Sequence, residues 1–222
     1  MSRRAKLPWL NALLVVVVAV ALAGCGGGDS DTGASVPSTS ASVTSPPPFE
    51  ADRALIALAD LPAGWAVDRD DSDNNNEFCG TGADLKSQVD IETVDKADAQ
   101  FAEGGNVPVL LHAVGVYPVD QASTAFDRFR SALTGCTSLT LDDGQKLKVA
   151  PVSFPSLGDE SVPLLFSGEV EGFPVAFYVI VVRVADGVTI IAYGGLSPDV
   201  SDAERFARLA TDKLGQAQSP SP

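Results

Sequence analysis

The sequence is poor in the residues that most often carry catalysis or bind metal ions. Its 222 residues include one histidine, one methionine and three cysteines. A Ser-His-Asp triad would have to use that histidine, His112, which lies mid-strand in an apolar stretch where a buried structural histidine is common. The chain also lacks a Gly-x-Ser-x-Gly elbow and a glycine-rich phosphate loop between a strand and a helix. We therefore expect no enzyme, no catalytic residue, no cofactor and no metal.

Basic residues are also scarce. Lysine and arginine total 15 against 29 aspartates and glutamates, which gives a formal net charge of −14. A chain of this charge is repelled by nucleic acid and by anionic lipid surfaces. We expect no nucleic-acid partner, and we interpret the acidic excess as ordinary solvation of the surface.

A long apolar run is missing too. The longest, Leu13 to Leu22, falls short of the 20 or so residues that span a membrane. It follows a basic start and ends in Ala23-Gly24-Cys25, an order typical of an exported signal sequence. The segment resembles a bacterial lipoprotein signal. That resemblance implies a signal peptide over 1–24, lipid attachment at Cys25 and a protein held at the extracytoplasmic face of the cell membrane; a retained membrane helix is the alternative.

The two remaining cysteines, Cys79 and Cys136, form an even pair in a chain predicted to be exported. Such pairs usually oxidise, so we predict a structural disulfide. The polar loop before Cys79 carries four aspartates between Asp68 and Asp73. Its spacing does not match a calcium-binding EF-hand loop, which needs glycine at position six and glutamate at position twelve. A solvated loop is the better interpretation.

Composition divides the chain into four parts. After the signal, residues 25–49 are rich in Gly, Ser, Thr and Pro and predict a flexible tether. Residues 50–215 have the size of one ordinary domain. Residues 216–222 predict a disordered tail.

Hydrophobic periodicity predicts an α+β domain. Three helices are expected, over 52–59 (capped by Asp52), 119–133 (capped by Asp120) and 201–214 (opened by a Ser201–Glu204 capping box and ended by Gly215). Strands are expected over 97–101, 107–117, 147–154 (with Lys146 and Lys148 outward), 161–170, 173–184 and 188–193. Strand 173–184 is apolar on both faces and should be central. The predicted fold is a curved antiparallel sheet of about six strands, with two main helices packed on one face plus a short N-terminal helix.

Several landmarks follow one another along the chain: Leu61-Pro62-Ala63-Gly64-Trp65, Cys79, Val116-Tyr117, the helix with Ala122, Phe126 and Phe129, and Cys136. Their order resembles the PknH-like extracellular sensor domain of actinobacterial receptor kinases and free-standing lipoproteins. The resemblance implies a bent antiparallel sheet that forms a groove with helices and binds an envelope ligand. The kinase type has two disulfides, whereas only the Cys79–Cys136 pair is possible here.

These observations favour a non-catalytic, lipid-anchored, monomeric ligand-binding domain. Its ligand would be a small molecule, a glycan or a lipid, and its partner surface the membrane through the lipid anchor. The strand aromatics Tyr117, Phe166, Tyr178 and Tyr193 are candidates for lining a cleft, although core burial is their ordinary role. Two alternatives remain. A lipid or glycolipid carrier needs a large cavity, and a cell-wall hydrolase needs two converging carboxylates, for which Asp159 and Glu160 are the only nearby pair.

Overall fold

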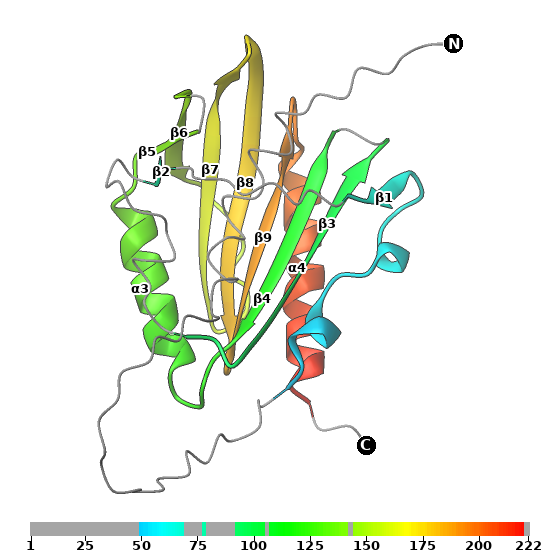
Figure 1. Ribbon diagram of the computed structural model, residues 1–222, viewed down its shortest axis with the longest axis vertical. Coiled ribbons are helices and arrows are strands. Elements are labelled where there is room, and N and C mark those ends of the chain that lie inside the picture. The colour runs from blue at the N-terminus through cyan, green and yellow to red at the C-terminus, as the bar shows by residue number, and fades with distance from the viewer. Residues whose placement is uncertain (1–48, 69–76, 79–91, 105–106, 142–143, 220–222) are drawn as a thin grey trace, which may run out of the picture.

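The structure, a computed structural model, describes residues 49–68, 77–78, 92–104, 107–141 and 144–219. These residues form a nine-stranded antiparallel sheet in the order β1-β3-β4-β9-β8-β7-β6-β5-β2 (Figure 1). The strands are β1 (Trp65–Val67), β2 (Glu77–Phe78), β3 (Asp95–Glu103), β4 (Val109–Val116), β5 (Ser138–Thr140), β6 (Lys146–Pro151), β7 (Glu160–Val170), β8 (Phe173–Val184) and β9 (Gly187–Gly195). The predicted class is confirmed, but the sheet has more strands than the six expected because β1, β2 and β5 are only two or three residues long.

Two α-helices, α3 (Ala122–Thr134) and α4 (Val200–Ala217), cover the sheet from opposite sides. Phe126 and Phe129 of α3 pack with Leu111, whereas Phe206 of α4 packs with Leu110. Adjacent residues of a strand point to opposite faces, so these two leucines place the helices on different faces. The prediction that both main helices lie on one face is therefore wrong.

The central strands are long and apolar because they are buried on both faces. β8 is the fifth of the nine strands, and every residue of β9 is buried. On β8, Val179 and Val181 face α3, while Ile180 faces α4. The prediction of a central strand over 173–184 is confirmed.

The N-terminal segment is two short 3-10 turns instead of one helix. They are η3 (Ala51–Ala54) and η4 (Leu58–Asp60), separated by three residues, of which Leu55 and Ala57 are extended. The side chains of Ala51, Ala54 and Ile56 are buried against the sheet and α4. Asp52 lies inside η3 and does not cap it, because the residue at the N-cap is Glu50.

Both main helices begin at residues other than the predicted caps. Asp120 has a φ of +67° and lies outside α3, whose N-cap is Gln121. Helix α4 starts after Asp199, whose carboxylate accepts a hydrogen bond from the Ser201 amide at 2.8 Å. It continues through Gly215 to Ala217, since glycine is tolerated in a helix supported by packing.

Cys25 and Cys79 lie outside the described residues, as do the signal segment, almost all of the tether and most of the acidic loop. Cys136 is buried just beyond the end of α3, where the sequence predicted it. None of the helices in the described ranges has the length and apolar character needed to cross a membrane.

Candidate functional site

The face of the sheet under α4 is only partly covered. Helix α4 packs over β9 and β8, with side chains of β4 and β3 in the same core cluster, and Phe154 and Leu157 of the connection between β6 and β7 join that cluster. Half-buried apolar side chains of β6, β7 and β8 lie at the edge of this cover, and one of them, Tyr178, also packs against the α4-side core. We call this set the open face: Ala150, Leu165, Ala176 and Tyr178.

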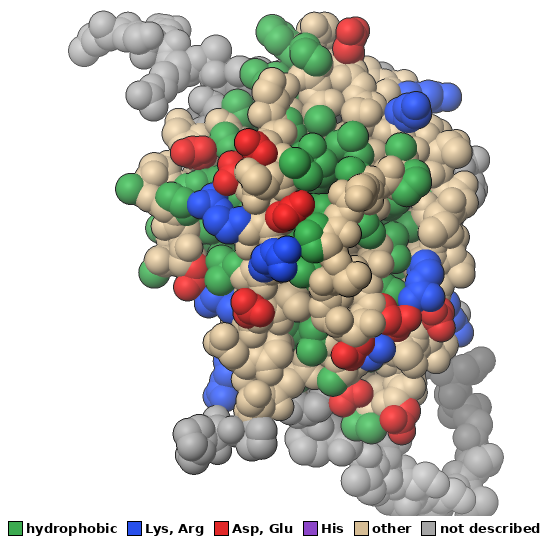
Figure 2. Space-filling view, turned by 180° about the vertical axis from the view of Figure 1, so that it is seen from behind, with side chains coloured by type: hydrophobic (Ala, Val, Ile, Leu, Met, Phe, Trp, Pro, Cys, Tyr) green, Lys and Arg blue, Asp and Glu red, His purple; other side chains and the backbone are tan. Residues whose placement is uncertain are grey.

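A continuous row of side chains leads from the open face into the core. Ala150 lies opposite Leu165, Leu165 opposite Tyr178, and Tyr178 opposite Tyr193. Tyr193 is buried beneath α4, with its ring centroid 5.2 Å from that of Phe206. Because neighbouring strands lie about 4.8 Å apart, the accessible part of this row is about 10 Å wide. Figure 2, which views the molecule from behind the sheet of Figure 1, shows hydrophobic side chains gathered in the upper part of this side.

Two lysines border the open face. Lys146 and Lys148 alternate along β6 with Leu147 and Val149, which are buried on the α3 side, so both lysines project on the α4 side. Both are exposed, as the sequence predicted. Lys148 lies opposite Ser167 of β7 and Ser138 of β5. The open face therefore combines an apolar floor with a basic and hydroxyl-bearing margin.

Asp202 and Glu169 are two acidic residues near the open face, and Asp202 is engaged by neighbouring side chains. Asp202 on α4 accepts a hydrogen bond from the Tyr193 hydroxyl at 3.4 Å and forms an ion pair with Arg205 at 2.9 Å. Burial, together with the nearby Asp202 charge, raises the pKa of Tyr193 to about 12. That hydroxyl therefore stays protonated at physiological pH and acts as a hydrogen-bond donor. Glu169 is exposed on the same side of β7, beyond Ser167.

His112 is a structural residue in the middle of the α4-side core. Its side chain is fully buried, its Nδ1 accepts a hydrogen bond from the Ile56 amide at 2.9 Å, and its Nε2 lies 2.7 Å from Thr189 Oγ1. The threonine hydroxyl in turn donates to the Ala113 carbonyl at 3.1 Å, which assigns the ring proton to Nε2. Burial lowers the pKa of His112 to about 3. A ring whose two nitrogens are both occupied has no nitrogen left for acid-base catalysis.

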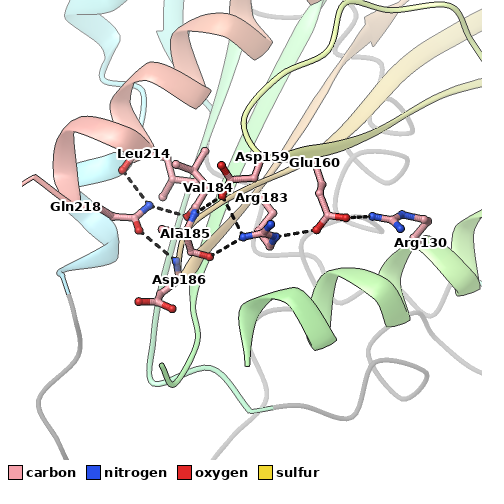
Figure 3. A network of polar contacts seen from close by, with 9 residues as sticks. All are labelled: Arg130, Asp159, Glu160, Arg183, Val184, Ala185, Asp186, Leu214 and Gln218. Carbon is pink, nitrogen blue, oxygen red and sulfur yellow. Dashed lines mark hydrogen bonds and ion pairs between the residues drawn. The ribbon is translucent and has the colours of Figure 1, made fainter. Parts of the chain in front are cut away.

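The carboxylate pair Asp159–Glu160 is bound by arginines (Figure 3). Arg183 forms ion pairs with Glu160 at 2.8 Å and Asp159 at 3.0 Å, and Arg130 of α3 contacts the second Glu160 oxygen. The Arg183 and Arg130 hydrogen bonds lower the pKa of Glu160. A glycosidase acid needs a raised pKa, so this pair does not have the properties of a hydrolase site.

The same network joins both sides of the sheet at one end of the molecule. Gln218, just beyond α4, donates to the Val184 carbonyl at 2.8 Å and accepts from the Asp186 amide at 3.2 Å. Asp159 accepts from the Ala185 amide at 2.8 Å. Arg130 extends the network to α3, so it holds the β8–β9 turn between the two helices (Figure 3).

Two hollows are bordered by described residues near α3, and one is small and the other shallow. An apolar cavity of about 20 Å³ lies between α3 and the sheet, beside Tyr117, Phe129 and Ile190. A wide, open depression of about 470 Å³ follows the outer side of α3 near Asp127 and Ser131. The first is large enough for a single water, and neither resembles the deep cavity that a lipid carrier needs. Within the described ranges, no cluster of three His, Cys, Asp or Glu side chains suits a metal ion.

The four candidate aromatics have different positions. Tyr117 and Phe166 are buried in the α3-side core, and burial raises the pKa of Tyr117. Tyr193 is buried under α4, and Tyr178 alone belongs to the open face. Sequence reasoning missed Leu165 and Ala150. Their alternation with buried α3-side residues was visible, but the pattern does not say how far a helix extends over the opposite face.

Comparison with known proteins supports the fold. No protein-family model matches the chain, and no curated protein matches it. Among solved structures, the extracellular domain of PknH from Mycobacterium tuberculosis superimposes with a TM-score of 0.51 at 11% sequence identity. The match covers 75% of this chain and 95% of that domain. The chain therefore has a PknH-like fold, as its landmarks predicted.

Proposed function

We propose that this chain is a lipid-anchored extracytoplasmic protein whose domain over 50–215 binds a ligand without transforming it. The observation that carries the proposal is the PknH-like fold, since that neighbour is described as an extracellular domain. The signal-like start and Cys25 supply the anchor in this proposal. The open face is where a ligand is accommodated, because it is an accessible apolar surface beside polar groups.

The side-chain chemistry agrees with a binding role. The two features that suggested catalysis, His112 and the Asp159–Glu160 pair, are held in structural hydrogen bonds and ion pairs. In this proposal the Cys79–Cys136 disulfide stiffens the domain. The pairing of β2 with β5 supports it, because Phe78, the residue before Cys79, lies opposite Leu139, three residues after Cys136.

The anchor is tested by replacing the acylated residue. Cys25→Ser should move the full-length protein from the membrane fraction to precursor or to the medium, and the lipid mass should disappear from intact-mass spectra. Ser30→Ala, in the same tether, is the matched control and should remain in the membrane fraction. A Cys25→Ser protein that is processed and retained like the wild type would refute the anchor.

The binding role is tested on protein purified from its own envelope. Native mass spectrometry should detect a co-purifying small molecule, glycan or lipid that is released on unfolding. Tyr178→Ala should reduce its occupancy, because that ring belongs to the open face, whereas Tyr117→Phe on the α3 side should not. Equal ligand occupancy in the wild type and in Tyr178→Ala would show that the ligand does not bind at this face.

A further inference from the structure

The open face has one margin of distinct charge. The chain as a whole carries a net charge of −14, yet Lys146 and Lys148 stand side by side on one strand at the border of an apolar surface. Side chains two residues apart on a strand lie about 7 Å from each other. Within the described part of the chain, neither lysine forms an ion pair, whereas Arg130, Arg183 and Lys213 all do.

Among the described residues, two exposed acids lie nearest these lysines, and one is Glu171, whose amide donates a hydrogen bond to Gln145 beside Lys146 at 3.2 Å. The other is Glu169, on the same side of β7, and no ion pair joins either acid to Lys146 or Lys148 within the described ranges. Asp202, on the far side of the open face, is already matched by Arg205 and by the Tyr193 hydroxyl. An anionic group therefore gains the largest electrostatic stabilisation at the lysine end of the open face.

Apolar and basic parts lie at the spacing of one small molecule. Ala150 follows Lys148 by two residues on β6, about 7 Å along the strand. From Ala150 the row through Leu165 to Tyr178 runs about 10 Å across the sheet toward α4. Ser167, opposite Lys148, adds a hydroxyl beside the basic end.

We propose that the open face binds one molecule of an anionic amphiphile. Its charged head lies against Lys146 and Lys148, and its apolar chain lies over Ala150, Leu165 and Tyr178. This inference rests on the proposed binding function and names the ligand class for the same face.

The occupant is a single molecule and not a bilayer surface. The accessible row is narrow and is bordered by α4 and by the β6–β7 connection, whose side chains pack on the same face of the sheet. The overall negative charge also repels an anionic membrane, while two local lysines suffice for one head group. In addition, Phe49, where the described chain leaves the tether, packs near Gly187 and Leu214, at the end of the molecule opposite β6 (Figure 1).

The test uses the full acylated chain in zwitterionic lipid nanodiscs and a soluble probe, dihexanoylphosphatidylglycerol. Titration calorimetry should show binding that Lys146→Gln with Lys148→Gln weakens by about 10-fold to 30-fold, since each lysine contributes roughly fivefold. The control pair Lys96→Gln with Arg208→Gln removes the same charge elsewhere and should change binding by less than about twofold. Leu165→Asn should weaken both this probe and dihexanoylphosphatidylcholine, because it acts on the apolar floor.

Three outcomes would overturn the inference. They are an equal loss in both double variants, no loss in either, or a lysine effect seen only when the nanodisc itself contains phosphatidylglycerol. If the lysine pair has no effect while native mass spectrometry still finds a ligand, the inference fails and the proposed function stands. If no ligand co-purifies and neither probe binds, the proposed function fails as well.

Discussion

Hydrogen bonds of the His112 side chain connect the N-terminal segment to the middle of the sheet. It joins Ile56 on that segment to Thr189 on β9, so one side chain connects three parts of the chain. Two further contacts hold the same segment, Ala51 to Asp95 at 2.8 Å and Asp60 to Lys213 at 2.6 Å. Together they hold the first described residues of the chain against the sheet and α4.

The pKa of His112 makes this attachment depend on pH. Its folded-state value of about 3 lies below the ordinary 6.5, because burial and the Lys213 charge disfavour the cation. The stabilising contribution is therefore complete above pH 6.5, and it is lost as pH falls toward 3, by up to about 1.4 kcal/mol per pH unit. Asp95 and Asp60 are the acids that hold the same segment, and Asp60 has a lowered pKa through its bond with Lys213.

His112→Asn should separate this effect from other titrations. Asparagine keeps an acceptor for the Ile56 amide but cannot ionise, so the variant should be less stable than wild type at pH 7.5 by about 1–3 kcal/mol. By pH 5 that difference should shrink by about 2 kcal/mol. Denaturant unfolding at both pH values measures it, and an unchanged difference would show that His112 titrates normally.

Gly158 and Gly172 have similar backbone conformations but differ in the space around them. Both have positive φ, +57° and +81°, but a Cβ at Gly158 would lie 2.4 Å from the Arg183 carbonyl oxygen, whereas a Cβ at Gly172 meets nothing within 4 Å. Gly172→Ala should cost about 1–2 kcal/mol for the backbone alone. Gly158→Ala should cost more than about 3 kcal/mol, because the turn beside Asp159 must also shift. Equal unfolding free energies for the two variants would contradict this geometry.

At the scale of the element, α4 has several possible starting residues, and the structure selects one. The sequence Ser197-Pro198-Asp199-Val200-Ser201 contains three residues that favour N-caps. Asp199 performs this role, accepting hydrogen bonds from both the amide and the hydroxyl of Ser201. These bonds lower the pKa of Asp199, so the cap is strongest above pH 4.

Removing the cap should destabilise the helix that borders the open face. Asp199→Ala should lower Tm by about 2–4 °C, because an exposed first turn loses its acceptor. Ser201→Ala keeps the amide donor and should lower Tm by less than about 1 °C. Differential scanning calorimetry of both variants checks the assignment, which is wrong if Ser201→Ala has the larger effect.

The helices and long strands could be predicted because their periodicity is strong. The buried stripe Ala203, Phe206, Ala210 and Leu214 and the alternation at Ala97, Ala99 and Phe101 were both visible in the sequence. The face on which each helix packs was not, because a stripe shows which side of a helix is buried and not which side of the sheet it meets. The two-sided burial of β8 held the missing information, since one helix on each face is the simplest way to cover it.

The candidate site was harder to predict than the fold. Lys146 and Lys148 were correctly placed outward. Whether a sheet face is open, however, depends on which elements pack over it, and strand periodicity does not show where α4 and the β6–β7 connection lie. The short strands β2 and β5 were missed for a related reason. Two or three residues carry no measurable period, so only their pairing partners define them.

On the scale of the whole molecule, the predicted Cys79–Cys136 disulfide would link the residue that follows β2 to the residue that follows the C-cap of α3. It closes a long loop, for which chain entropy gives about 4 kcal/mol as an upper figure. Intact-mass measurement should show two fewer hydrogens than the reduced chain, and reductant should lower the unfolding free energy by up to that amount. Two free thiols in the native protein would contradict the pairing.

The two margins of the sheet, β1 and β2, come from the single stretch between Trp65 and Phe78. Both are very short, and short outer strands discourage pairing with other chains. A variant that lacks this stretch would therefore leave β3 and β5 as the outer strands of the sheet. Exposed strand edges of this kind favour edge-to-edge association between copies of a chain.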